Sequence, residues 1–63
     1  MSSDHAQLSS VSTALEDLTR RVTESAERHV GTDDEDIASE LFEIERSMRA
    51  ASRRLARVVR RIQ

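Results

Sequence analysis

The sequence lacks several residue types, and each absence removes a class of structure. Cysteine is absent, which excludes disulfide bonds and thiolate metal sites, and two separated histidines, His5 and His29, cannot form a structural zinc site alone. Proline is absent and Gly31 is the only glycine, so helix-breaking residues occur at one place only. No apolar run approaches the ~18–20 residues that a membrane-spanning helix needs. Residues 1–5 also lack the basic flank and apolar core of a secretory signal. We therefore expect a cytoplasmic helical protein with no membrane segment, metal or cofactor.

The chain of 63 residues is expected to form one domain, residues 1–63. A core of this size supplies only ~3–5 kcal/mol of net stability. Small domains usually add disulfides, a metal or a partner subunit. Since the first two are not expected, association becomes the expected source of additional stability.

Apolar residues recur in two segments with alternating steps of three and four residues. The first segment contains Leu8, Val11, Leu15, Leu18, Val22, Ser25 and His29. The second contains Ile37, Leu41, Ile44, Met48, Ala51, Leu55, Val58 and Ile62. This spacing keeps one stripe of each helix toward a neighbour, as in coiled coils and four-helix bundles. It predicts helices over about residues 5–30 and 33–62, with residues 1–7 open to fraying because serines weaken the first turns.

The segment between the two patterns carries signals for a tight turn. Gly31 favours the left-handed backbone conformation that ends a helix, and His29 suits a capping or packing role in the last turn. Thr32 and Glu35 have the spacing of a capping box, and the first turn of the second helix is rich in acidic residues. A loop of about two or three residues would make the helices antiparallel neighbours.

These patterns predict an all-α fold, an antiparallel two-helix hairpin. A layer of two helices leaves its apolar residues partly in water, so we expect a second hairpin to complete a homodimeric four-helix bundle. The expected interface residues, including Phe42 as the only aromatic side chain, are Leu15, Leu18, Val22, Leu41, Phe42, Ile44, Met48, Leu55, Val58 and Val59. The expected partner is a second copy, and a helix of another protein is the alternative.

Charge is divided into two blocks along the second helix. Residues 33–45 contain seven acidic residues and no basic ones, and residues 46–61 contain seven arginines and no acidic ones. Compensation of the helix dipole explains charge only in the terminal turns. Two antiparallel copies would instead set acidic against basic halves, with Glu40, Glu43 or Glu45 of one chain near Arg46, Arg49 or Arg53 of the other. A third interpretation is an external acidic or phosphate-bearing partner.

The arginines also suggest an alternative function. Arginine binds phosphate and carboxylate oxygens through paired N–H groups. The candidate anion-binding residues, spaced by three and four along the second helix, are Arg46, Arg49, Arg53, Arg57 and Arg60. Nucleic acid or an anionic nucleotide is therefore the alternative ligand, although one aromatic residue offers little base stacking.

No spacing of ionisable residues indicates catalysis. The carboxylates and arginines of the first helix have the i,i+3 and i,i+4 spacing of surface ion pairs, whereas catalytic groups need a desolvated cleft. We expect no enzyme. The function predicted from the sequence is a small non-catalytic interaction or regulatory module that acts through helix packing and self-association.

Overall fold

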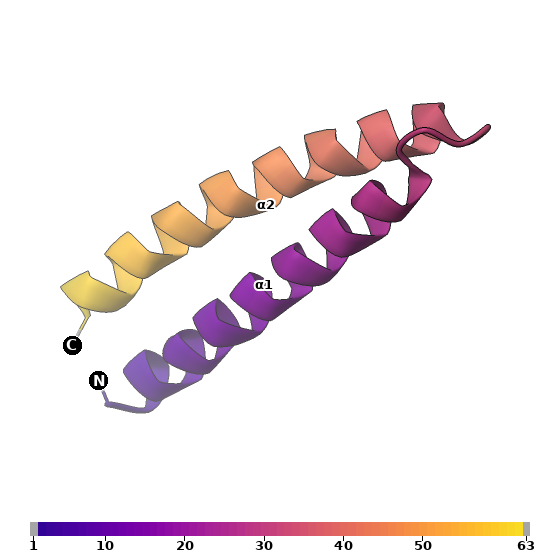
Figure 1. Cartoon of the computed structure of the whole chain (residues 1–63). Helices are drawn as coiled ribbons and strands as arrows, with labels where there is room; N and C mark the ends of the chain where they lie inside the picture. The colour runs from indigo at the N-terminus through magenta and orange to yellow at the C-terminus, as the bar shows by residue number, and fades with distance from the viewer. Residues whose placement is uncertain (1, 63) are drawn as a thin grey trace.

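The chain folds into a helical hairpin made of two long α-helices that pack against each other (Figure 1). The computed structural model describes residues 2–62, with side chains from Ser3 onward. Helix α1 spans Ser2–His29 and helix α2 spans Glu35–Arg61. The helices run antiparallel, so both chain ends lie at the end of the hairpin opposite the loop (Figure 1). The predicted all-α hairpin is confirmed.

The helix ends differ from the predicted ones by a few residues. Helix α1 begins at Ser2 instead of about residue 5, and α2 ends at Arg61, one residue early. Met1, within the segment expected to fray, and Gln63 lie outside the described residues. Helix α2 begins at Glu35 instead of about residue 33, so the loop covers residues 30–34 and is longer than predicted.

The hydrogen bonds of the loop explain the late start of α2. Gly31 has the expected positive φ of 77°. The Thr32 hydroxyl donates to the His29 carbonyl (2.6 Å) and accepts from the Asp34 backbone N–H (3.1 Å). The Glu35 carboxylate accepts from the Gly31 N–H (3.0 Å). The predicted capping box is therefore wrong in its pairing, because Thr32 binds an amide two residues ahead and forms a turn of its own before the helix starts.

Small and polar side chains lie deepest between the two helices. The only buried side chains in the described part of the chain are Thr19, Ala26 and Ala38. The remaining residues at their heptad positions are half-buried and mostly polar, namely His5, Ser12, Glu45, Ser52 and Val59. Small side chains at these positions allow the helix backbones to approach closely. We call these eight residues the inner seam.

A second pair of half-buried rows borders the inner seam. The row on α1 consists of Leu8, Leu15, Val22 and His29, and the row on α2 consists of Leu41, Met48, Leu55 and Ile62. All eight were predicted to lie between the helices. The predicted residues that alternate with them along α1 do not lie between the helices, since Val11 and Leu18 keep 49% and 47% of their surface exposed. The predicted contact was thus rotated: the helices meet through the bordering rows and the inner seam, not through the row of Val11 and Leu18.

No helix in the described part of the chain is both long enough and apolar enough to cross a membrane.

Candidate association surface

Six large apolar side chains of the described residues remain 41–52% exposed, and five of them follow one pattern. Val11 and Leu18 lie seven residues apart on α1, as do Ile37 and Ile44 on α2. Val58 continues the α2 row after Ala51. A seven-residue step returns to the same side of a helix, so each set forms a continuous row. The sixth residue, Val30, lies in the loop.

Both exposed rows lie on the same face of the hairpin. On α1 each row member directly precedes an inner-seam residue, as Leu18 precedes Thr19. On α2 the order is the same, since Ile37 precedes Ala38 and Ile44 precedes Glu45. Antiparallel helices in a hairpin are related by an approximate twofold axis perpendicular to their layer, and such an axis keeps each side of the layer on its own side. Because the exposed residues directly precede the inner-seam residues on both helices, this axis places the two exposed rows on the same side of the hairpin.

This side of the hairpin forms a broad apolar surface, which we call the apolar face. It consists of the exposed Val11, Leu18, Ile37, Ile44 and Val58 together with the half-buried Leu15, Val22, Leu41, Met48 and Leu55. The chain exposes 4775 Å², compared with about 4,100 Å² for a typical folded monomer of its mass. Exposed apolar surface of this extent is typical of interaction sites. The structure is thus a small two-helix hairpin with many exposed hydrophobic residues, consistent with a packing or association module.

Most of the interface residues predicted from the sequence lie on this face. Of these predicted residues, Leu18, Ile44 and Val58 are exposed. The half-buried ones are Leu15, Val22, Leu41, Met48 and Leu55. Val59 instead lies in the inner seam. Phe42 is half-buried and lies two turns before Arg49, on the opposite side. Val11 and Ile37 were missing from the predicted interface residues, although their seven-residue spacing from Leu18 and Ile44 was visible in the sequence.

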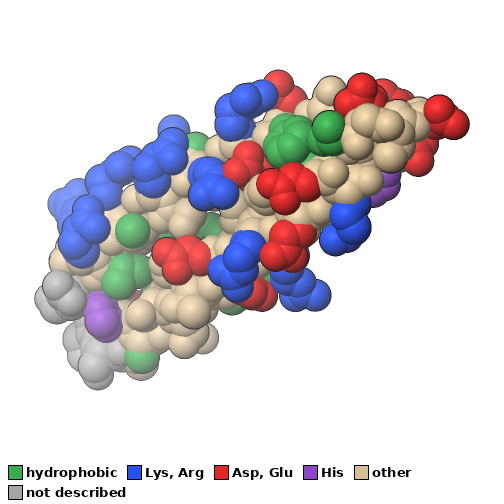
Figure 2. Space-filling view, in the orientation of Figure 1, with side chains coloured by type: hydrophobic (Ala, Val, Ile, Leu, Met, Phe, Trp, Pro, Cys, Tyr) green, Lys and Arg blue, Asp and Glu red, His purple; other side chains and the backbone are tan. Residues whose placement is uncertain are grey.

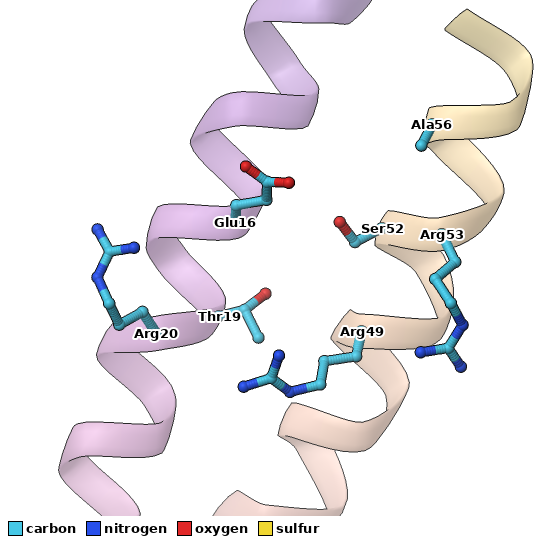
Figure 3. A pocket seen from close by; sticks show the side chains of 7 residues that line it. All are labelled: Glu16, Thr19, Arg20, Arg49, Ser52, Arg53 and Ala56. Carbon is cyan, nitrogen blue, oxygen red and sulfur yellow. The ribbon is translucent and has the colours of Figure 1, made fainter. Parts of the chain in front are cut away.

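A shallow groove runs along the opposite side of the hairpin, where the side chains in view are mainly polar or charged (Figure 2). Its lining residues come from both helices and are Glu16, Thr19, Arg20, Arg49, Ser52, Arg53 and Ala56 (Figure 3). Several of their polar groups already have partners. Thr19 donates to the Leu15 carbonyl (2.7 Å), Arg20 pairs with Asp17, and Arg49 pairs with Glu45.

Glu45 is the acidic member of the inner seam. Its side chain is only 16% exposed, whereas that of Arg49 is 55% exposed. The hydrogen bond from Arg49 lowers the pKa of the Glu45 carboxyl, against a smaller opposing effect of desolvation. Thr23 and the positive charge of Arg46 have smaller effects on this pKa in the same direction as Arg49. Since Glu45 lies between the helices, its predicted contact with a second chain is not supported.

The candidate anion-binding arginines are all exposed on α2. Arg46 pairs with Glu43, and Arg49 pairs with Glu45, within the helix. Arg53, Arg57 and Arg60 form no ion pair with any residue that the structure describes. Basic side chains follow α2 toward its C-terminal end, and acidic ones gather toward the loop (Figure 2).

In comparison with known proteins, no family model, curated protein or solved structure matches the chain.

Proposed function

We propose that the protein is a small, non-catalytic interaction module that binds a second copy of itself through the apolar face and forms a homodimeric four-helix bundle. The observation that carries the proposal is the heptad arrangement of five exposed aliphatic residues on one face of the hairpin. Scattered exposed hydrophobic residues would be unremarkable, but continuous rows on two adjacent helices are typical of bundle interfaces. A regulatory role would then be exercised through helix–helix contacts.

The dimensions of the apolar face suit a stable dimer. The hairpin is 49 Å long, and two adjacent helices are about 20 Å wide. Each copy therefore offers roughly 800–1,000 Å², and stacking two faces would remove about 1,600–2,000 Å² from water. This area falls within the range of specific protein–protein interfaces.

The absence of catalysis is also part of the proposal. The ion pairs of α1 are exposed, since the side chains of Asp17, Arg20 and Arg21 keep about half or more of their surface in water. Groups in this environment function mainly in solubility and surface electrostatics. An open groove of this kind does not exclude water from a reaction.

Sedimentation equilibrium at micromolar concentration tests the proposed self-association. We expect a mass near twice the monomer mass of 7.1 kDa, together with strongly helical circular dichroism. A compact helical monomer throughout the micromolar range would overturn the proposal.

The exposed Arg53, Arg57 and Arg60 support a second candidate function, binding of nucleic acid or an anionic nucleotide. Binding of a fluorescent single-stranded RNA should then weaken steeply with salt, because each phosphate contact releases counterions. The triple substitution Arg53→Ala, Arg57→Ala, Arg60→Ala should abolish this RNA binding. No measurable RNA binding at 50 mM salt would eliminate this candidate.

A further inference from the structure

We infer that the second copy docks on the apolar face turned end for end, with α1 packed on α1 and α2 packed on α2. The loop of each hairpin then lies over the open end of the other. This inference rests on the proposed self-association and specifies its geometry. It is carried by the distribution of charge along the hairpin and by the positions of the charged residues that border the apolar face.

Charge is strongly separated along the length of the hairpin. The half nearest the loop, about residues 16–47, carries eleven acidic residues and four arginines. The rest of the chain carries one acidic residue and six arginines. Figure 2 shows this separation as acidic side chains near the loop and basic ones toward the C-terminal end of α2.

Only one of the two symmetric ways to stack the hairpins relieves this separation. If both loops lay at the same end, two strongly acidic halves would be stacked about 10 Å apart, which is close to the ~8 Å screening length of physiological salt. Turning one copy end for end sets each acidic half against a basic half. Long-range electrostatics therefore favour the inverted arrangement.

A row of exposed residues on α2 and in the loop just before it borders the apolar face and is complementary to itself. Its members, spaced by seven residues, are Asp33, Glu40, Ser47, Arg54 and Arg61. We call them the rim row. The row reads acidic, acidic, neutral, basic, basic, so two antiparallel copies centred on Ser47 place Asp33 opposite Arg61 and Glu40 opposite Arg54.

The exposed apolar rows also pair in the inverted dimer, about nearly the same central position of α2. With α2 antiparallel to its copy, Ile37 of one chain lies opposite Val58 of the other, and Ile44 lies opposite Ala51. Both pairs are centred between residues 47 and 48, near the middle of Glu35–Arg61. On α1, Val11 lies opposite Leu18, with its centre near the middle of Ser2–His29. Inversion therefore aligns the full length of both helices.

The arrangement with loops at the same end satisfies fewer charges. There α2 would pack on α1 of the other copy, and Asp33 and Glu40 would face Arg28 and Arg21, which is favourable. However, the next row outward would set Asp36 against Glu24 and Glu43 against Asp17. In the inverted dimer, Asp36 instead faces Arg57. The rim thus agrees with the long-range charge in favouring inversion.

The structure also revises which arginines would meet the second copy. Arg49 and Arg53 line the groove, on the side away from the apolar face. The neighbouring Arg54 belongs to the rim row. The predicted contacts of Glu40 with Arg49 or Arg53 are therefore replaced by a contact with Arg54.

Spin-label distances separate the two arrangements. The chain has no cysteine, so Val30→Cys introduces a single labelling site in the loop without changing the charge. In the inverted dimer, two nitroxides at position 30 should lie about 40–50 Å apart, since the 28 residues of α1 rise about 1.5 Å each. With the loops at the same end they should lie within about 30 Å. Ser47→Cys is the matched control near the twofold axis, where the inverted dimer should give a distance below about 25 Å.

The possible results distinguish the inference from the function on which it rests. A long distance at position 30 and a short one at position 47 support inversion. A dimer with a short distance at position 30 overturns the inference and leaves self-association intact. A monomer by sedimentation with no dipolar coupling overturns both.

A charge exchange provides an independent measurement. Arg54→Glu should weaken the dimer by about two- to thirtyfold, because each exposed pair has a small effect and occurs twice in the dimer. Arg53→Glu carries the same change of charge on the groove side and should leave the dissociation constant within about twofold. Mixing Arg54→Glu with Glu40→Arg should restore association as a heterodimer. Equal effects of Arg53→Glu and Arg54→Glu, with no recovery on mixing, would contradict the inverted rim.

Discussion

The double substitution Leu18→Ala, Ile44→Ala tests the apolar face directly, because it removes aliphatic surface from both helices without entering the inner seam. Leu18 and Ile44 are 47% and 45% exposed in the hairpin. A single hairpin therefore derives only part of the stabilisation that these side chains can give. The remainder becomes available when a second copy covers them.

The size of the effect follows from this remaining exposure. Full burial of Leu or Ile contributes ~1.5–3 kcal/mol, so burying the exposed half should contribute about 0.7–1.5 kcal/mol per side chain. Four such side chains are truncated in each dimer. The expected loss is about 3–6 kcal/mol of association free energy, which weakens the dimer roughly 100- to 20,000-fold.

Sedimentation equilibrium over a concentration series measures the dissociation constant. The matched control is Val30→Ala, because Val30 is 52% exposed but lies in the loop, outside the apolar face. Val30→Ala should change the dissociation constant by no more than about twofold, since its side chain gains little burial on association. If the double variant behaves like this control, the exposed rows do not form the interface and the reasoning is refuted.

Three further predictions concern the hairpin itself. Gly31→Ala should cost about 1 kcal/mol in chemical denaturation, because φ is +77° and a Cβ would meet nothing within 4 Å, so the cost is in the backbone alone; a D-alanine at this position should not destabilise the chain. Ala38→Leu should cost ~1–3 kcal/mol by overpacking the seam, where Ala38 is 3% exposed, whereas the exposed neighbour Ser39→Leu should have little effect on the unfolding midpoint. Because the hydrogen bond from Arg49 lowers the pKa of the Glu45 carboxyl, its contribution to the free energy of unfolding should be present above its ordinary pKa of 4.5 and lost as pH falls through the lowered pKa; Glu45→Gln should flatten this acid part of the dependence of stability on pH.

The hairpin could be predicted from the sequence because several independent signals agree. Heptad spacing predicted two helices, and Gly31 predicted where the first would end. Gly31 has the expected positive φ, and α1 ends at His29. Signals of this kind depend on local backbone preferences, which a single sequence records well.

The rotation of each helix about its axis was not predictable from hydrophobicity alone. An apolar residue predicts burial, but it does not distinguish a contact inside the hairpin from a contact with another molecule. Thr19 is 4% exposed, although its hydroxyl gave no reason to place it in the core. Its hydroxyl is satisfied by the Leu15 carbonyl of its own helix, which removes most of the cost of burying it. The capping box failed because the Thr32 hydroxyl accepts from the Asp34 N–H, two residues ahead, and not from the Glu35 N–H.

The placement of polar and apolar residues within the hairpin bears on how the chain folds. Thr19, Glu45 and Ser52 lie in the inner seam, whereas Leu18, Ile44 and Val58 remain exposed beside them. A hairpin that was stable alone would gain more by burying the aliphatic row between its helices, because burial of apolar area is the main favourable term in folding. The opposite arrangement gives the inner seam a small and partly polar contact and leaves the larger apolar area for a second molecule. Folding and association should therefore be coupled, so that the midpoint of thermal unfolding rises with protein concentration. A midpoint that stays constant over a hundredfold range of concentration would show that the two-helix layer suffices alone and that the apolar face does not stabilise it.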